Sequence, residues 1–169
     1  MATDVIPEPT IIELKPEWFK PGYYVYVVAI IYRQLQYYYV GMTGDRKYEV
    51  ARSPFYRMSG HFNQLESSTQ NQILKGLKEK TVGTDIDDVL SESKFIYYCY
   101  IIDEYRKDKL ELHKEKRIKA EKIESYLIKK LKALFGEEHV LNKKYSLKNF
   151  NDVEIAGERL YTNLISKLN

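Results

Sequence analysis

The chain has little of several residue types, and each shortage narrows what it can be. Cys99 is the one cysteine among 169 residues, which excludes an internal disulfide and a cysteine-rich zinc site and favours a reducing, cytoplasmic setting. Eight glycines and five prolines are too few for a collagen-like or linker-rich chain. No apolar run approaches the roughly 18 residues of a membrane span, and no signal-peptide pattern opens the sequence. These shortages predict a soluble globular protein with no membrane partner.

Tyrosine is the residue type in excess. The sequence has 16 Tyr against six Phe and one Trp. Such a surplus fits a β-sheet, a binding face or a chemical role, because the ring is amphipathic and its hydroxyl can titrate. The net charge of +3 is too small to indicate a nucleic-acid partner. Because it is positive, it does not argue against one either.

Three segments read as strands because they are rich in β-branched and aromatic residues. They cover 24–32, 36–41 and 95–102, and the third is apolar enough to be expected at the centre of the sheet. The polar residues 33 and 34 separate the first two expected strands, which suggests that these strands form a hairpin. Pairing Tyr26 with Tyr39 places its turn between Tyr32 and Arg33.

Helices are expected between and after these strands. Ser53-Pro54 resembles an N-cap followed by a first-turn proline, and Gly136 resembles a C-cap. The expected helices cover about 54–65, 107–135 and 152–168, with a short one at 73–77. The fold class is therefore α/β (α+β), a small antiparallel sheet of about three strands flanked by helices.

Two features near the hairpin depart from local rules. Gly41 interrupts a segment of high β-propensity, which indicates a bulge, a close backbone approach, or simply the strand's end. Arg57 and His61 are four residues apart in an expected helix, so they share a face and can reach one anion together, although an exposed helix face is the commoner origin of such a pair.

Two further polar residues follow in the second half of the chain. Glu124 lies at the edge of the apolar stripe of the long helix, which is formed by Ala120, Ile123, Leu127, Leu131 and Leu134. A carboxylate there can hold Mg²⁺ or form a surface ion pair with a lysine. Asn142 follows a short apolar piece and, taken alone, fits a turn.

Taken together and in this order, these residues resemble the GIY-YIG nuclease family. The matching elements are Tyr24-Val25-Tyr26, Tyr39-Val40-Gly41, Arg57 with His61, Ala120-x3-Glu124-x2-Leu127-Ile128, and Asn142. The first motif lacks its glycine if Tyr26 is its tyrosine, whereas Gly22-Tyr23-Tyr24 supplies one, so Tyr24 remains the alternative to Tyr26. The stretch between His61 and the third strand is longer than the family's minimal module requires.

The resemblance implies a division of the chain and a site. Residues 1–22 are an extended arm, 23–145 the catalytic domain with an insert at about 62–93, and 146–169 a C-terminal helix packed on it. It implies hydrolysis of DNA phosphodiester bonds with one Mg²⁺ or Mn²⁺ held by Glu124. Tyr26 would take a proton from the attacking water and Tyr39 would orient that water.

Three more residues have implied roles in the same site. Arg57 would stabilise phosphoryl charge, and His61 would assist the phosphate or a proton relay. Gly41 is a structural motif position, and Asn142 would position the site or the DNA backbone.

Substrate binding is expected from the long helix. Between Arg106 and Lys132 there are eleven Lys or Arg against five acids, a local excess of six over a whole-chain charge of +3. A solvated helix with internal ion pairs is the alternative. The candidate DNA contacts are Lys114, Lys116, Arg117, Lys119 and Lys122. His113 and His139 have no partner at metal spacing and are expected at the surface.

The sequence thus predicts an endonuclease of restriction or mobile-element type. A structure-specific repair nuclease, a non-catalytic nucleic-acid-binding module of the same fold, and a protein-interaction domain using the tyrosines remain open. A homodimer is implied if both DNA strands are cut.

Overall fold

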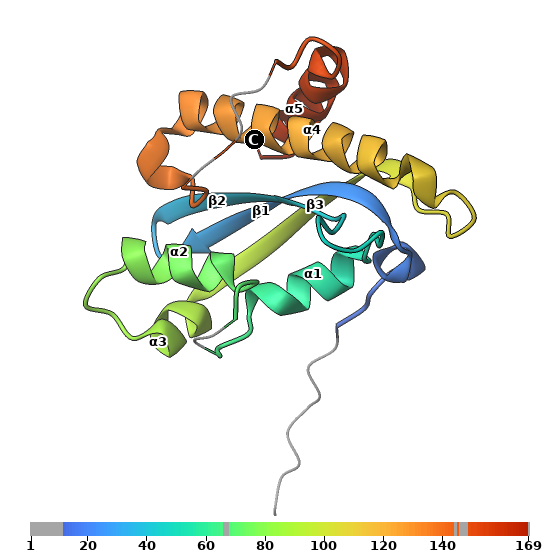
Figure 1. Cartoon of the computed structure of the whole chain (residues 1–169). Coiled ribbons are helices and arrows are strands. Elements are labelled where there is room, and N and C mark those ends of the chain that lie inside the picture. The colour runs from blue at the N-terminus through green and yellow to red at the C-terminus, as the bar shows by residue number, and fades with distance from the viewer. Residues whose placement is uncertain (1–11, 66–67, 144, 146–148, 169) are drawn as a thin grey trace, which may run out of the picture.

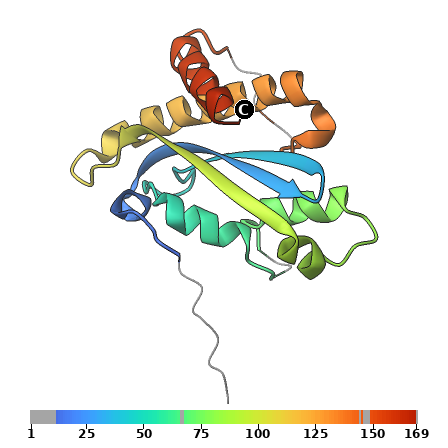
Figure 2. The same ribbon diagram turned by 180° about the vertical axis from the view of Figure 1, so that it is seen from behind.

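A three-stranded antiparallel sheet forms the middle layer of the molecule. The computed structural model describes residues 12–65, 68–143, 145 and 149–168. The strands are β1 (Gly22–Tyr32), β2 (Leu35–Met42) and β3 (Ser93–Glu104), in the order β2-β1-β3. Helices cover both faces of the sheet (Figures 1 and 2). The architecture therefore confirms the α+β class expected from the sequence.

The two helical layers differ in composition. On one face lies α4 (His113–Phe135), with α5 (Glu154–Leu168) packed against it. The other face carries α1 (Pro54–His61), α2 (Gln72–Lys80) and α3 (Ile86–Ser91). Short 3₁₀ turns lie at Pro16–Phe19, Leu110–Leu112 and Glu137–His139. No helix within the described residues is long and apolar enough to cross a membrane.

β1 is the central strand, and its alternating side chains build two separate cores. One set, represented by Val25 and Val27, packs with α4 residues such as Leu127. The other, which includes Tyr26 and Val28, packs with apolar residues of α2 and α3. The expectation that 95–102 is central was wrong: within the described residues β3 pairs with β1 alone, so it forms an edge of the sheet despite its apolar sequence.

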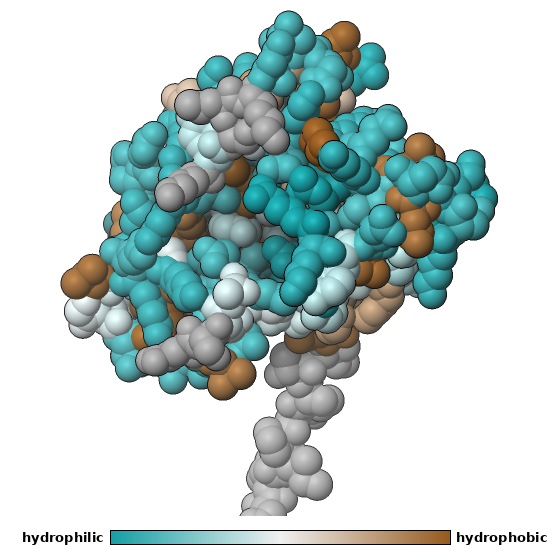
Figure 3. All heavy atoms as spheres, viewed as in Figure 1, coloured by the Kyte–Doolittle hydropathy of each residue, from teal (hydrophilic) through white to brown (hydrophobic). Residues whose placement is uncertain are grey.

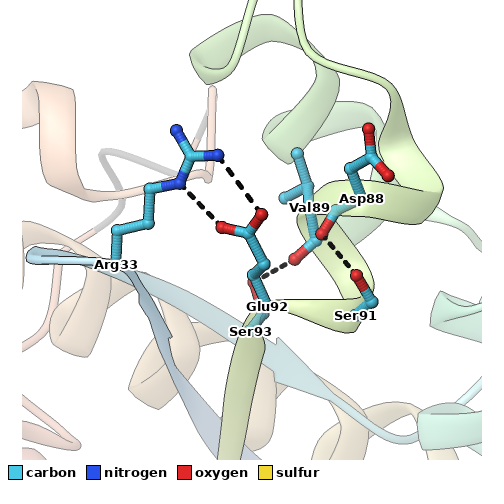
Figure 4. Close-up of polar contacts among 6 residues, drawn as sticks. All are labelled: Arg33, Asp88, Val89, Ser91, Glu92 and Ser93. Atoms are coloured by element: carbon cyan, nitrogen blue, oxygen red, sulfur yellow. Dashed lines mark hydrogen bonds and ion pairs between the residues drawn. The ribbon is translucent and has the colours of Figure 1, made fainter.

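The β1–β2 hairpin turns at Arg33 and Gln34, because Tyr32 pairs with Leu35. Arg33 has a φ of 54°, and its guanidinium binds Glu92 with Nε–Oε2 and Nη2–Oε1 distances of 2.7 and 3.3 Å. Figure 4 shows this pair joining the hairpin to the end of α3, where Ser91 and Ser93 bind backbone carbonyls of the same helix.

This turn corrects the expected register of the hairpin. Tyr26 lies opposite Gly41 and not Tyr39, which instead lies opposite Val28. The error is two residues. Because side chains alternate with a period of two, Tyr26 and Tyr39 still point to the same face.

Several helix boundaries differ from expectation. α1 ends at His61 and not near Leu65, and α4 begins at His113, after a 3₁₀ turn, and not near 107. Gly136 ends α4 with a φ of 92°, a conformation in which glycine is favoured. Leu134, assigned to the buried stripe of α4, is 51% exposed.

The N-terminal end of the chain is only partly as expected. Residues 1–11 of the predicted arm lie outside the described residues. The rest of that arm contains a 3₁₀ turn, and its last residue, Gly22, opens β1, so it is not uniformly extended.

The segment from 62 to 93 contains more structure than the sequence indicated. α2 runs over nine residues, and α3, which was not expected, follows it. Ile73 and Leu77 of α2 are fully buried, and a Cβ at Gly76 would be 2.9 Å from the Leu141 Cβ. This segment is therefore part of the helical layer that covers the face of Tyr26.

Candidate active site

Helix α1 presents Arg57 and His61 to the face of the sheet that carries Tyr26. Its N-terminus is capped as expected: the Ser53 side chain accepts a hydrogen bond from the Tyr56 backbone N–H, and Pro54 occupies the first turn. His61, in its last turn, is fully buried. The Arg57–His61 pair therefore faces the core and is not an exposed helix face.

Tyr26 and His61 form the closest polar contact of this site. The Tyr26 hydroxyl oxygen lies 2.6 Å from His61 Nε2, and both side chains are buried. The Tyr39 ring packs edge-on against the His61 ring, with centroids 4.8 Å apart. Tyr24 is two residues away along β1, whereas it is Tyr26 that forms the hydrogen bond and the ring contact with His61, so geometry favours Tyr26 over Tyr24 as the tyrosine of the site.

Burial sets the protonation of these groups in the free protein. Desolvation, with a contribution from the Arg57 charge, lowers the pKa of His61 to about 3, and the Gln70 backbone partly offsets it. Desolvation raises the pKa of Tyr26 to about 12, against the opposing effect of Arg57. It also raises the pKa of Tyr39 well above its ordinary value. At neutral pH the site thus holds a neutral imidazole beside two protonated phenols.

Arg57 connects the tyrosines with the carboxylate of α4. The positive charge of its half-buried guanidinium favours ionisation of Tyr26, Tyr39 and Glu124. Its Nε is buried and has no hydrogen-bond partner within the described residues. A buried donor without a partner can bind an incoming anion at no cost in existing hydrogen bonds.

Glu124 and Glu121 lie one turn apart on α4 in different environments. Glu121 is held by two arginines: Arg46 Nη2 is 2.6 Å from one carboxylate oxygen, and Arg117 Nη2 is 3.0 Å from the other. Glu124 has no hydrogen-bond or ion-pair partner among the described residues. Burial, followed by repulsion from Glu121, raises the pKa of Glu124 to about 8, although Arg57, Arg46 and Arg117 lower it.

The unpartnered carboxyl group of Glu124 lines two hollows. One, of about 270 Å³, is lined by Arg46, Arg52, Arg57 and Arg117 together with Asp45, Glu121 and Glu124, and we call it the arginine cleft. The other, of about 430 Å³, lies between α2 and residues 141–143 and also includes Tyr39, and we call it the α2 groove. Figure 3 shows a hollow in this face of the molecule, bordered mainly by hydrophilic residues.

Gly41 allows the Tyr26 ring to lie directly over the neighbouring strand. A Cβ added at Gly41 would overlap the phenol oxygen and ring carbons of Tyr26. β2 continues through Gly41 to Met42 with no break in its pairing with β1. Of the readings open from the sequence, the close backbone approach is therefore the one observed.

Asn142 acts on the backbone at the outer edge of β2. Its side-chain Oδ1 accepts from the Val40 N–H and its Nδ2 donates to the Val40 carbonyl, both at 2.8 Å. Leu141 N donates to the Tyr38 carbonyl at 2.8 Å, and Val140 bridges Tyr38 in parallel. Asn142 thus clamps the strand that carries Tyr39 and Gly41, and it is not a simple turn residue.

We expect Asn142→Ala to destabilise the fold by about 2 kcal/mol, because it leaves the Val40 N–H and carbonyl without their partners. Urea unfolding followed by circular dichroism measures the change. Lys143→Ala is the matched control: it removes an exposed pair with Glu79 and should cost less than about 0.5 kcal/mol. Equal stability of Asn142→Ala and the wild type would contradict the clamp.

The predicted DNA-contacting residues of α4 do not form one surface. Arg117 reaches the arginine cleft. Lys116 is paired with Asp103, and Lys122 with Asp152. Lys114 and Lys119 line a separate groove beside Asp152 and Val153.

The two remaining histidines are less exposed than expected. His113 is buried, with Nδ1 2.8 Å from the Tyr23 hydroxyl and Nε2 2.9 Å from the Asp45 carbonyl. His139 is partly buried, and its Nδ1 donates to the Gln36 carbonyl. His113 thereby ties the start of α4 to the loop that carries Arg46.

Four charged cleft residues were not anticipated. Asp45, Arg46 and Arg52 belong to the loop after β2, and Glu121 was counted only as one of the acids of the long helix. The sequence signal that could have identified the loop is the cation content of 46–57, with four Lys or Arg directly before and within α1.

The candidate metal ligand is Glu124, which shares the arginine cleft with Asp45 and Glu121, two acids that are paired with arginines. Within the described ranges, no group of three or more His, Cys, Asp or Glu side chains could together hold a metal ion. Mg²⁺ is commonly bound through one or two carboxylates and keeps several waters. The unpartnered carboxyl group of Glu124, which lines the arginine cleft, fits that mode of binding.

Comparisons of the chain with protein-family models, with curated proteins and with solved structures found no match.

Proposed function

We propose that this chain is a metal-dependent endonuclease that hydrolyses DNA phosphodiester bonds. The observation that carries the proposal is the convergence of Tyr26, Tyr39, Arg57, His61 and Glu124 beside one edge of the sheet. These residues come from β1, β2, α1 and α4, and packing alone does not require an unpartnered acid among them. The GIY-YIG resemblance assigns a role to each of them.

Arg57 would bind the scissile phosphate. Its planar fork can hold two phosphoryl oxygens and remains charged at any working pH. The unpartnered Nε described above provides one of these donors. As negative charge develops on the phosphoryl oxygens in the transition state, this contact would strengthen.

Tyr26 and His61 would move the proton of the attacking water. The Tyr26 oxygen takes that proton as the Tyr26 hydroxyl proton passes along the 2.6 Å hydrogen bond to His61 Nε2, with His61 in its neutral form. Burial, followed by the Arg57 charge, lowers the pKa of His61, and the negative charge of a bound phosphodiester would raise it again in part. Tyr39, packed on the same imidazole, would orient the water.

Glu124 would hold one Mg²⁺ or Mn²⁺. The ion would supply Lewis-acid stabilisation of phosphoryl and leaving-group oxygens when bound. The arginine cleft has four arginines against three carboxylates, so it retains a positive charge that suits a polyanion.

The experiment that tests this function is an incubation of the full chain with a mixed DNA pool that includes branched substrates, in Mg²⁺ and with a chelator. New DNA ends that appear only with the metal would support an endonuclease. Cleavage confined to branched DNA would favour the repair alternative, and a fixed sequence at the ends would favour the restriction or mobile-element type. Paired breaks on both strands would favour a homodimer.

We expect Arg57→Lys to lower the cleavage rate by about 100-fold or more, because lysine keeps the charge but cannot hold two oxygens. Single-turnover kinetics at saturating DNA measure this effect on the chemical step. Arg159→Lys, an exposed change on α5, is the matched control and should leave the rate unaltered. An Arg57→Lys rate within threefold of the wild type would remove Arg57 from the proposed mechanism.

A further inference from the structure

The two hollows beside Glu124 differ in the cations that line them. On one side, the arginine cleft carries Arg46 and Arg52 on the loop between β2 and α1. On the other side, the α2 groove carries Lys75 and Lys143. Glu124 lines both hollows, so they meet at the carboxylate assigned to the metal.

Arg46 and Arg52 are accessible on the cleft side. The Arg46 side chain is 76% exposed although one of its nitrogens binds Glu121. The Arg52 guanidinium lies 4.3 Å from the centre of the exposed Tyr56 ring. Its distance to the nearest Asp45 carboxylate oxygen is 3.8 Å, which is too long for a hydrogen bond. Each guanidinium has five N–H donors, and the contacts of Arg46 and of Arg52 use only some of them. Both arginines can therefore bind phosphate in addition.

Lys75 is accessible on the groove side. It is exposed on α2, and its ammonium donates to the Ser68 carbonyl at 2.9 Å, with no acidic partner among the described residues. Lys143, in contrast, is paired with Glu79. The α2 helix is fixed in place by Ile73 and Leu77 in the core and by the contact of Gly76 with Leu141.

We propose that the arginine cleft and the α2 groove are two halves of one channel that holds a single nucleic-acid strand across Glu124. Arg46 and Arg52 contact the phosphate on one side of the scissile bond, and Lys75 contacts the phosphate on the other side. The α2 helix, which belongs to the segment that is long for a minimal module, is then a wall of the substrate channel. This inference rests on the proposed function.

The size and position of the hollows support a strand and not an isolated anion. Proteins bind small molecules in pockets of about 300–1,000 Å³. The α2 groove, of about 430 Å³, falls within this range, and the arginine cleft, of about 270 Å³, lies just below it. Both hollows include Glu124 and one residue of β2, Met42 in the arginine cleft and Tyr39 in the α2 groove, whereas a site for one free phosphate needs only one hollow. Cations at both ends would neutralise phosphates at both ends of such a strand.

The test couples single-charge variants with single-charge changes in the DNA. The variants are Arg52→Gln and Lys75→Gln in the full chain, and the substrate is an oligonucleotide whose cleavage position has been mapped. A neutral methylphosphonate replaces one phosphate at a time on either side of the scissile bond. Affinity is measured with a chelator present, so that the readout does not depend on cleavage.

On unmodified DNA, each variant should bind about three- to tenfold more weakly at low salt. The loss of affinity caused by Arg52→Gln should disappear when the methylphosphonate lies on one side of the scissile bond. The loss of affinity caused by Lys75→Gln should disappear when it lies on the opposite side. Lys78→Gln is the matched control, because Lys78 shares another hollow of α2 with Lys75 but does not line the α2 groove.

The failures of the two proposals are distinguishable. In one outcome, the protein binds and cuts DNA while both variants respond to a neutral linkage on the same side of the scissile bond, or to none. That result would overturn the channel and leave the proposed function intact. No binding and no cleavage by the wild type would overturn the proposed function and the channel with it.

Discussion

Glu124→Gln is expected to abolish metal-dependent cleavage, with a fall in rate of at least about 1,000-fold, while DNA affinity changes little. Glutamine keeps the size of the side chain but removes the charge that holds a divalent cation. The arginines and lysines of the two hollows remain, so phosphate binding should persist. Cleavage by Glu124→Gln at the wild-type rate would show that this carboxylate does not hold the catalytic metal.

The same variant should also be more stable than the wild type at high pH. The pKa of Glu124 is raised from 4.5 to about 8 in the folded protein, chiefly by burial and then by Glu121. A raised pKa means that the folded state binds the proton more tightly than the unfolded state. The contribution of Glu124 to the free energy of unfolding is therefore greatest below pH 4.5 and is lost as the pH rises from 4.5 to about 8. The full shift corresponds to about 4 to 5 kcal/mol of unfolding free energy, of which Glu124→Gln should recover a large part at pH 9.

Urea unfolding at pH 4.5 and pH 9, without and with Mg²⁺, measures this linkage. The two proteins should differ most at pH 9 without metal, and Mg²⁺ should stabilise the wild type and not Glu124→Gln. Glu115→Gln, an exposed change on the same helix, is the control and should follow the wild type. A Glu124→Gln stability that shows the same decline with pH as the wild type would contradict the buried, unpartnered state of Glu124.

Gly41→Ala is expected to destabilise the fold by about 2 to 3 kcal/mol and to lower cleavage by about 100-fold or more. The new Cβ would overlap the Tyr26 hydroxyl and ring, and Tyr26, 2% exposed, has no free space into which to move. Because the overlap includes the hydroxyl oxygen itself, relieving it should disturb the 2.6 Å contact with His61 Nε2 on which the proposed proton path depends. Chemical unfolding and single-turnover cleavage measure the two effects.

A double-mutant cycle separates this clash from a general effect of a residue in β2. In a Tyr26→Leu background, which shortens the overlapping side chain, Gly41→Ala should cost clearly less than in the wild type. Gly60→Ala on α1 meets only the flexible Gln70 side chain and should change stability by less than about 1 kcal/mol. Strict additivity of the changes at Gly41 and Tyr26 would exclude a direct clash.

The local rules predicted the main elements because each is encoded by neighbouring residues. Ser53 and Pro54 mark the start of α1, and Gly136 marks the end of α4, and the structure confirms both boundaries. The hairpin was identified, but its register was not, since the polar break allowed turns one residue apart. The lateral order of the strands depends on pairing with β1, which the apolar sequence of β3 does not specify.

The candidate site was predictable to the extent that spacing fixes a shared face. The spacing of Arg57 and His61 placed them together, and the period of α4 placed Glu124 beside the apolar stripe. The contact of Tyr26 with Gly41 and the clamp of Asn142 on Val40 join residues 15 and 102 positions apart, so they depend on tertiary packing. The pairing of Glu121 with Arg46 depends in the same way on how the loop after β2 folds back onto α4.

The most direct test of the account is to sequence the DNA ends produced by the wild type and by Glu124→Gln from one mixed pool of linear and branched substrates in Mg²⁺. The account predicts discrete new ends from the wild type, their loss with a chelator, and none from Glu124→Gln, although both proteins bind the DNA. If the wild type binds DNA and yields no new ends with Mg²⁺ or Mn²⁺, the chain is a binding module and the proposed chemistry is wrong.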